Sequence, residues 1–377
     1  MQPVIADSIC AFGREEWNRL FADELEDWDY YLAVERAGLA GFSWVYFGVR
    51  EDDRLLAAVP GFVTDYRLDT TVTGKLWHVT NAVSRAFPRL LTLRMLALGS
   101  PVAEVCHLGF APELDGEQKQ RLLGTILAWA ESHAQANRVR LLAVKDAGDE
   151  QDQLWSAAAR ATRLRRQPGL PTATLDIRFD SIDEYLGSLG RVTRRDLRRK
   201  LRSASALRVE WRHTIDDVVA DILRLYRSTR SNAEYQFEDL TPDYFSGVLR
   251  TLGDRAVCAL YWRDGRLVAF NLLLHDGKRL IDKFLGMDSE VVREYNLYFV
   301  SWIENVRYCI EHDIAVYQSG QGLHREKIRL GSRLSPNWLW YRHRNVALDS
   351  MLALLERLAR LDRLDPELAA LIRSRRQ

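Results

Sequence analysis

The sequence predicts a mixed α/β protein made of two consecutive halves followed by a C-terminal helix. Its 377 residues exceed what one hydrophobic core usually organises, about 250–300 residues. Both halves show the same order of patterns: a strand hairpin, a long amphipathic helix, a short apolar strand, and a polar turn before another helix. Segment Gln167–Pro171 contains one glycine and two prolines and indicates the boundary. We therefore expect domains over residues 1–170 and 171–345, and a helical extension over residues 346–377.

The first half is expected to open with two helices, and a strand hairpin follows them. β-branched and aromatic residues flank the polar turn Glu51–Asp53, which is typical of a hairpin. Segment Glu117–Asn137 has the apolar period of an amphipathic helix. The expected elements are helices around Glu15–Glu24 and over Asp27–Gly38, strands Ser43–Arg50, Arg54–Val63, Met95–Leu98, Ala103–Leu108 and Arg138–Val144, a loop or lid over Thr71–Pro88, and helix Gln151–Ala161.

The second half contains the clearest pattern, a three-stranded antiparallel meander with an Asp-Gly pair in each turn. Before it, the spacings Ser181 to Glu184 and Thr193 to Asp196 each predict a capped helix start. The expected elements are strands Ala173–Phe179 and Leu207–His213, helices Asp216–Ser228 and Thr241–Leu252, meander strands Ala256–Trp262, Leu267–Leu274 and Arg279–Gly286, helix Tyr295–Glu311, strands Ile314–Gln318 and Trp338–His343, and helix Val346–Leu361.

Composition argues against several classes of protein. The formal net charge is only +1, so nucleic acid or a membrane would have to be met through a local patch, and no DNA partner is expected. No apolar stretch is long enough to span a bilayer, and charged residues interrupt the N-terminus before a signal peptide could form. The four cysteines are widely separated, which favours a cytoplasmic protein. The eight histidines show no ligand spacing, so no metal is expected.

A basic helix is predicted over Arg191–Arg202. Residues four apart share a helix face, so Arg195 lies beside Arg199. Guanidinium groups bind phosphate oxygens in pairs, so this row suits a phosphate-bearing donor or an RNA backbone. A solvated face paired with nearby acids is the alternative.

Two further segments combine polar residues with a helix start. Met287–Asn296 lies between a predicted strand and a predicted helix, where backbone amides and Arg293 could bind an anion. It has no glycine to let a phosphate approach the backbone, so an ordinary capped loop is the alternative. Tyr317–Lys327 reads YQSGQGLHREK, a strand end with a glycine-hinged turn that enters a helix. Ligand sites gather at such strand ends, and a plain turn with a surface Lys327 is the alternative.

The Ser-Gly-Gln-Gly turn, with Lys327 and the pair Leu330-Gly331 after it, resembles the GNAT-fold acyltransferases of the CelD and FemAB-like type. Helix Leu186–Arg202 is similar to the arginine-containing helix that opens the same domain in that family. The resemblance covers Ser181 to about His343. It implies tandem GNAT-like domains, of which the second is catalytic, and transfer of an acyl group to an amine.

Two departures from the family leave the donor open. Gln318 stands where the family has an acidic residue, and the usual coenzyme A loop is absent, with only Arg293 near its place. The first interpretation is an N-acyltransferase that uses acyl-coenzyme A. Fem-type relatives use aminoacyl-tRNA, so the second is a tRNA-dependent transferase that acts on a peptide or small-molecule amine. The third is a non-catalytic binding protein with the same fold.

The reaction needs a base for the amine, a partner for the developing oxyanion and a proton for the leaving thiolate. The resemblance implies that a splayed central strand, Lys283–Gly286, supplies oxyanion-binding amides and that Tyr295 protonates the thiolate. The expected catalytic residues are Glu294, Tyr295, His275 and Lys327, with His324 as a further candidate base. The expected donor-binding residues are Arg293, Lys283, Phe284, Gly286, Arg195 and Arg199, and the expected acceptor-binding residues are Tyr235, Asp282, Gln318, Gln321 and His324.

Overall fold

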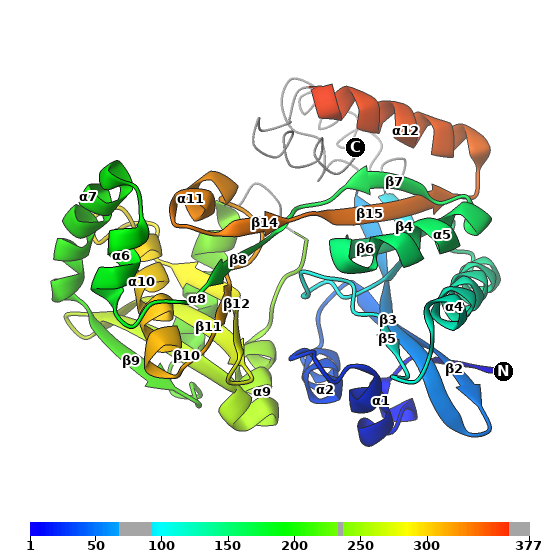
Figure 1. Ribbon diagram of the computed structural model, residues 1–377, viewed down its shortest axis with the longest axis horizontal. Coiled ribbons are helices and arrows are strands. Elements are labelled where there is room, and N and C mark those ends of the chain that lie inside the picture. The colour runs from blue at the N-terminus through cyan, green and yellow to red at the C-terminus, as the bar shows by residue number, and fades with distance from the viewer. Residues whose placement is uncertain (68–91, 233–236, 362–377) are drawn as a thin grey trace. The chain divides into compact units, whose positions relative to one another are not determined.

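A computed structural model describes residues 1–67, 92–232 and 237–361 (Figure 1). The predicted loop Thr71–Pro88 and the predicted site residue Tyr235 lie outside these ranges. The chain forms two compact units, and each unit is built from stretches that are separate in the sequence. The first unit comprises Met1–Leu32, Ala40–Leu170 and Pro336–Gln377, and the second comprises Ala33–Leu39 and Pro171–Ser335. None of the described helices combines the length and the apolar composition that crossing a bilayer requires.

The first unit is built on one mixed sheet, with strands in the order β1-β2-β3-β4-β6-β15-β7 and β5 paired with β3. Its neighbouring strands are antiparallel except for the parallel pair β4 and β6. The elements are β1 (Gln2–Ala6), α1 (Arg14–Leu20), α2 (Trp28–Arg36), β2 (Phe42–Glu51), β3 (Arg54–Arg67), β4 (Thr92–Leu98), β5 (Gly109–Phe110), α4 (Gly116–Ala136), β6 (Leu141–Gly148), α5 (Asp152–Thr162), β7 (Arg165–Pro168), β15 (Asn337–His343) and α12 (Val346–Leu361).

Helix α4 supplies much of the core of the first unit. Its start is fixed by a capping box, in which Asp115 and Gln118 each bond the other's backbone N–H. Its buried face, which includes Leu123 and Ile126, packs on the sheet residues Phe47 and Leu96. The apolar period of the sequence therefore predicts this helix within one residue at each end.

Three features of the first unit differ from the prediction. Segment 103–108 is not a strand, and the short β5 follows it. Strands β1 and β7 are only five and four residues long and are not predicted. Segment Trp338–His343 was expected with the second half, but β15 lies between β6 and β7 of the first unit. A sequence pattern cannot reveal this pairing, because the partner strands lie about 170–200 residues away along the chain.

The second unit has its own sheet, in the order β14-β8-β13-β12-β11-β10-β9. The predicted meander is present as β10, β11 and β12, and the only parallel pair in the described sheet is β12 with β13. The elements are β8 (Thr172–Asp176), α6 (Ile182–Ser188), α7 (Arg191–Lys200), β9 (Arg208–Arg212), α8 (Val219–Ser231), α9 (Pro242–Leu252), β10 (Ala256–Arg263), β11 (Arg266–His275), β12 (Arg279–Met287), α10 (Leu297–Glu311), β13 (Val316–Gln318), α11 (His324–Arg329) and β14 (Arg333–Ser335).

Helices cover both faces of this sheet. Helices α6 and α10 pack on one face, where Tyr185 and Trp302 join the buried cluster. On the other face, Phe245 of α9 has edge-to-face contacts with Phe270 and Phe284 of the sheet. The predicted cap at Thr193 is wrong: α7 begins at Arg191 after Gly190. The Asp196 carboxylate instead pairs with arginine and lysine side chains one turn later on the same helix.

Candidate functional site at the divergence of β12 and β13

The site lies where two parallel strands separate. Strands β12 and β13 pair through three positions only, and the last joins Ile281 to Gln318. Beyond it, β12 continues to Met287 with β11 as its one strand neighbour among the described residues. The register with β11 shifts here, because Leu273 lies opposite Asp282 and Leu272 lies opposite Phe284. Lys283 is therefore the extra residue of a β-bulge, and the strand is splayed at the predicted place.

Asp282 is the first residue of β12 beyond the shared pairing. Its Oδ2 atom accepts three hydrogen bonds: from the Tyr317 hydroxyl at 2.9 Å, from Asn271 Nδ2 at 3.2 Å and from Asn305 Nδ2 at 3.4 Å. Among the described residues, none donates a hydrogen bond to Oδ1. Burial raises the pKa of this carboxyl above its usual value, although Asn271 and the charge of Lys327 oppose the shift. The carboxylate is thus held by one oxygen and presents the other.

The donors to Asp282 are themselves fixed by packing. The Asn271 and Asn305 side chains are fully buried, one on β11 and one on α10. Asn271 Nδ2 also donates to Ser301 Oγ at 3.1 Å, and Asn305 Nδ2 also donates to the Tyr317 hydroxyl at 2.9 Å. Three elements, β11, α10 and β13, therefore donate to one carboxylate on β12, which is the arrangement that a preorganised polar site requires.

Lys327 holds the glycine turn that follows β13. Its side chain is only 4% exposed, and Nζ donates to the carbonyl oxygens of Ser319 at 2.5 Å and Gly320 at 2.7 Å. Gly320 and Gly322 have φ angles of 83° and 98°, which explains why glycine stands at both positions. The alternative of a surface lysine is wrong, and the buried ammonium places a positive charge beside the site.

Neither candidate histidine contacts Asp282 in the structure. His275 lies opposite Leu280, near the start of β12, and one ring nitrogen is 3.3 Å from the Tyr308 hydroxyl. Burial lowers the pKa of His275, which favours its neutral form. His324 Nε2 accepts a hydrogen bond from the Gly322 backbone N–H at 3.4 Å, within the glycine turn. Their bonds place both histidines in structural networks.

The segment before α10 forms a series of turns. Asp288 is buried and pairs with Arg266 at 2.6 Å and Arg224 at 3.4 Å, which ties the segment to β11 and α8. Arg293 and Glu294 are exposed. A hydrogen bond to Glu294 raises the pKa of Tyr295. Helix α10 has no side-chain cap at its start, but the backbone N–H groups of Leu297 and Phe299 already donate to the carbonyl oxygens of Val292 and Asn296. Arg293 lies four residues before the helix.

The predicted basic helix borders an open surface depression of about 800 Å³. Asp196, Val192 and seven arginines line it: Arg191, Arg194, Arg195, Arg198, Arg199, Arg202 and Arg329. Arg199 pairs with Asp196 at 2.7 Å, whereas Arg195 has no ion-pair partner among the described residues. Both interpretations of the helix therefore hold in part: some charges are neutralised locally and others remain available.

Comparison with known proteins agrees with this geometry. Residues 191–327 match the family model of the acetyltransferase (GNAT) domain. The chain has a tandem GNAT-like fold, and its second unit contains the region that matches this domain. It is similar to the crystal structure of FemX, with a TM-score of 0.58, 13% identity, and coverage of 94% of this chain and 100% of FemX. It is also similar to a tandem GNAT protein from the clavulanic acid biosynthesis pathway, with a TM-score of 0.53, 12% identity, and coverage of 91% and 98%.

Two further proteins that are similar to this chain are named as synthetases or synthases. The C-terminal domain of a putative lysylphosphatidylglycerol synthetase from Agrobacterium fabrum has a TM-score of 0.55 at 13% identity, with 91% of this chain and 96% of that chain covered. A putative 8-amino-7-oxononanoate synthase 2 from Mycobacterium tuberculosis is 25% identical over 327 residues, or 84% of this chain. The chain spans 42% of the length of that curated relative.

The sequence interpretation missed the residues that orient Asp282. Asn271 interrupts an otherwise apolar strand, and Asn305 lies on the core face of a helix with many apolar residues. A polar residue at a core position is itself a signal, because burying an amide requires partners.

Gly286 was expected to bind the donor, but the structure gives it a packing reason to be glycine. A Cβ there would lie 2.1 Å from Phe270 Cε1, so close packing requires glycine. Among the described residues, no group of three acidic, histidine or cysteine side chains could hold a metal.

Proposed function

We propose that this protein is an N-acyltransferase that moves an acyl group from an acyl-coenzyme A thioester to the amine of a small molecule or peptide. The observation that carries this proposal is the separation of β12 from β13 beside a bulge and an oriented carboxylate. The thioester arm lies along Lys283–Gly286, whose strand edge on that side has no described strand partner. The dispersed, unpaired cysteines suit a cytoplasmic setting.

The chemistry divides among a few groups. The amine nitrogen forms a bond to the thioester carbon, whose oxygen becomes an oxyanion stabilised by backbone N–H groups of the bulge around Lys283. Asp282 Oδ1 accepts a proton from the nitrogen, since its raised pKa brings it closer to the working pH. The C–S bond then breaks, and the thiolate takes a proton from Tyr295 or from solvent. Arg293, which is exposed, binds a phosphate of the donor.

Donor binding gives the first test. Coenzyme A and its acetyl and long-chain acyl forms should raise the melting temperature of the full chain, because a ligand that binds only the folded state stabilises it. Arg293→Gln should make this shift smaller, which corresponds to an apparent Kd for coenzyme A about 10-fold higher than in the wild type. Arg307→Gln is the matched control, because that arginine lies in the second half of α10 and pairs with Glu304. No shift with any coenzyme A species, or equal loss in both variants, would reject this donor.

A second function is favoured by the arginine-lined depression beside α7. Its unpaired guanidinium groups suit a nucleic acid backbone, so the donor would be aminoacyl-tRNA and the chain would act as a Fem-like transferase. Four phosphate contacts would weaken tRNA binding by about 100-fold between 50 and 200 mM salt. Arg195→Gln with Arg199→Gln should reduce that salt dependence and leave the coenzyme A shift unchanged. If only tRNA binds, this second function takes first place.

A further inference from the structure

Three strand ends meet at one edge of the first unit. Strand β15 is antiparallel to both β6 and β7, with His343 opposite Leu141 and Tyr341 opposite Arg165. The end of β15 therefore lies beside the starts of β6 and β7. The C-terminal turns of α4 and α5 lead into the same edge, because each helix directly precedes one of these strands. Residues far apart in the sequence are thus brought together here.

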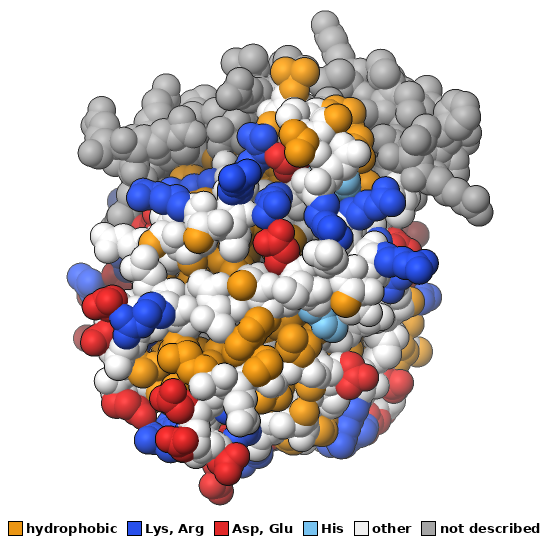
Figure 2. Space-filling model, turned by 90° about the vertical axis from the view of Figure 1, so that its right-hand side faces the viewer, with side chains coloured by type: hydrophobic (Ala, Val, Ile, Leu, Met, Phe, Trp, Pro, Cys, Tyr) orange, Lys and Arg blue, Asp and Glu red, His pale blue; other side chains and the backbone are white. Residues whose placement is uncertain are grey.

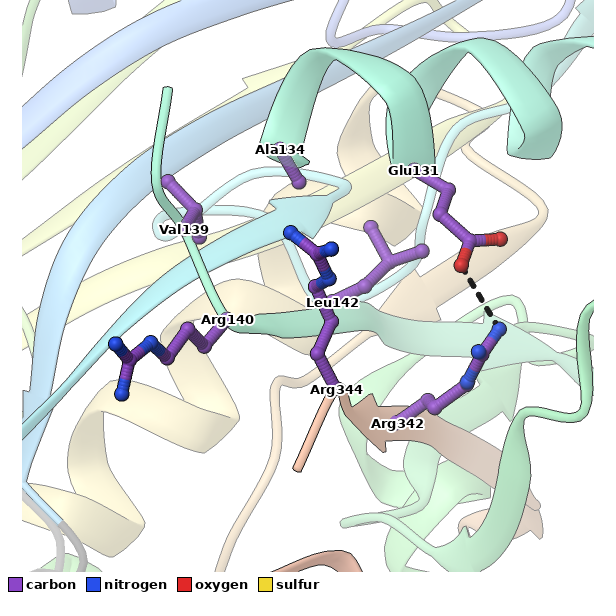
Figure 3. A pocket seen from close by; sticks show the side chains of 7 residues that line it. All are labelled: Glu131, Ala134, Val139, Arg140, Leu142, Arg342 and Arg344. Carbon is purple, nitrogen blue, oxygen red and sulfur yellow. Dashed lines mark hydrogen bonds and ion pairs between the residues drawn. The ribbon is translucent and has the colours of Figure 1, made fainter. Parts of the chain in front are cut away.

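Unpaired arginines gather at this edge. Five are exposed and have no ion-pair partner within the described residues, and together we name them the arginine edge: Arg138, Arg140, Arg160, Arg163 and Arg344. Nearby arginines differ, since Arg342 pairs with Glu131 at 2.9 Å and Arg165 pairs with Asp349 at 2.6 Å. Figure 3 shows Arg342 turned toward Glu131, while the Arg140 side chain points away from that pair. Glu131 and Asp349 are thus already paired, and the arginine edge keeps its positive charge with respect to the described part of the chain.

Helix α12 begins beside the arginine edge and is fixed to it. Asp349 accepts hydrogen bonds from the His343 backbone N–H at 2.9 Å and from Arg165 Nε at 2.6 Å. Asn345 Oδ1 caps the helix by accepting from the backbone N–H groups of Ala347 and Leu348. The position of the helix start relative to the strand ends is therefore set by buried and capping contacts.

The outer face of α12 carries three exposed apolar side chains, with the exposed Ser350 among them. Val346 is 78% exposed, Leu354 is 57% exposed and Met351 is 41% exposed, and we name these three residues the apolar stripe. At about 100° per residue they lie within an arc of about 140° on the helix. Figure 2 shows basic side chains in a band across this side of the molecule, with hydrophobic side chains above the band. Exposed apolar residues beside uncompensated cations need an explanation.

We propose that the arginine edge and the apolar stripe form a docking surface for the anionic phospholipid face of a membrane. The guanidinium groups meet lipid phosphates, and the apolar stripe enters the boundary between headgroups and acyl chains, as interfacial helices do. An RNA partner would use the charges but leave the apolar stripe in water. The net charge of +1 for the whole chain means that the attraction is local to this surface. The protein thereby works beside a membrane, and none of its described helices is long and apolar enough to span one.

Vesicle binding tests the proposal with the full chain. Vesicles of phosphatidylglycerol and phosphatidylcholine in equal parts should sediment the protein, and pure phosphatidylcholine vesicles should not. Arg140→Gln with Arg163→Gln and Arg344→Gln should weaken binding by about 100-fold. Met351→Ser with Leu354→Ser should also weaken it, while the dependence of binding on salt stays as in the wild type. These positions are exposed, so circular dichroism and melting temperature should show unchanged folding.

A matched variant on α7 separates this surface from the other basic region. Arg194→Gln with Arg195→Gln and Arg198→Gln removes the same charge from the second unit and should leave vesicle binding within about 2-fold of wild type. Three results would overturn the proposal: equal binding to pure phosphatidylcholine, loss of binding only in the α7 variant, or full binding after the apolar stripe is changed. Competition by bulk RNA that is lost in the arginine-edge variant, with no vesicle binding, would assign the surface to nucleic acid instead.

Discussion

The Tyr317 hydroxyl donates a 2.9 Å hydrogen bond to Asp282 Oδ2, which joins the end of β13 to β12 just where the strands separate. Burial raises the pKa of both groups, so this tyrosine stays protonated and remains a donor at neutral pH. Asn305 donates to the same hydroxyl at 2.9 Å and fixes its direction. Tyr317 is therefore a positioning residue for the carboxylate that we propose as the base.

Asp282→Asn should separate activity from stability. A carboxyl whose folded pKa is raised stabilises the fold at pH values below its unfolded pKa, about 3.9, and this contribution is lost as pH rises through the folded pKa. The neutral amide avoids that loss, so the variant should melt at the wild-type temperature or higher at pH 7. The difference should disappear near pH 3.5. Acyl transfer should fall by about 100-fold or more. An active variant would contradict the assignment. So would a variant whose melting temperature lies further below that of the wild type at pH 7 than at pH 4.

Tyr317→Phe tests the positioning role directly. The variant removes one donor to Asp282 and leaves the ring packing against Trp302, whose centroid is 5.1 Å away. We expect kcat to fall by about 10-fold with little change in KM for the donor, because the base is misdirected rather than removed. The pH profile of kcat should shift, since a hydrogen bond to the charged carboxylate is lost. An unchanged profile with a lower melting temperature would leave Tyr317 only a structural role.

Lys327→Met should destabilise the second unit. The substitution keeps the volume of the buried side chain but leaves the carbonyl oxygens of Ser319 and Gly320 without their donor. Each buried acceptor left unpaired costs about 1–3 kcal/mol, so the free energy of unfolding in urea should drop by at least about 1 kcal/mol. Arg329→Gln on the same helix is the control, because its pair with Glu326 is exposed and should be worth less than about 1 kcal/mol. Equal effects in both variants would show that Lys327 does not hold the turn.

The sequence predicts the elements whose signal is local. Two Asp-Gly turns between apolar segments predict the meander, and the long apolar helical segments predict α4 and α10. Long-range pairing is different, since nothing near Trp338 indicates that β15 lies between β6 and β7. The placement of Asp282 at the site could be predicted, because it directly precedes the expected splayed segment. Its donor Asn305 could not, since its role depends on how α10 packs across β11 and β12.

Gly286→Ala should be far more damaging than a glycine-to-alanine change elsewhere in the second unit. A Cβ at this position would lie 2.1 Å from Phe270 Cε1 and 2.9 Å from the Tyr226 backbone nitrogen. Backbone of α8 approaches β12 there, and it cannot move without disturbing the bond from the Met287 N–H to Thr229 Oγ1 at 2.7 Å. Overpacking of this kind costs about 1–3 kcal/mol in the free energy of unfolding.

Gly247→Ala is the matched control for this prediction. Gly247 lies inside α9, where a Cβ would meet no atom within 4 Å. Alanine at a helical position should stabilise the unit by about 0.5–1 kcal/mol, because the unfolded chain loses freedom and helix propensity rises. Urea unfolding of both variants should therefore change the free energy in opposite directions. If Gly286→Ala instead keeps wild-type stability but loses donor binding, the glycine serves the donor's approach to β12 and not the packing of α8.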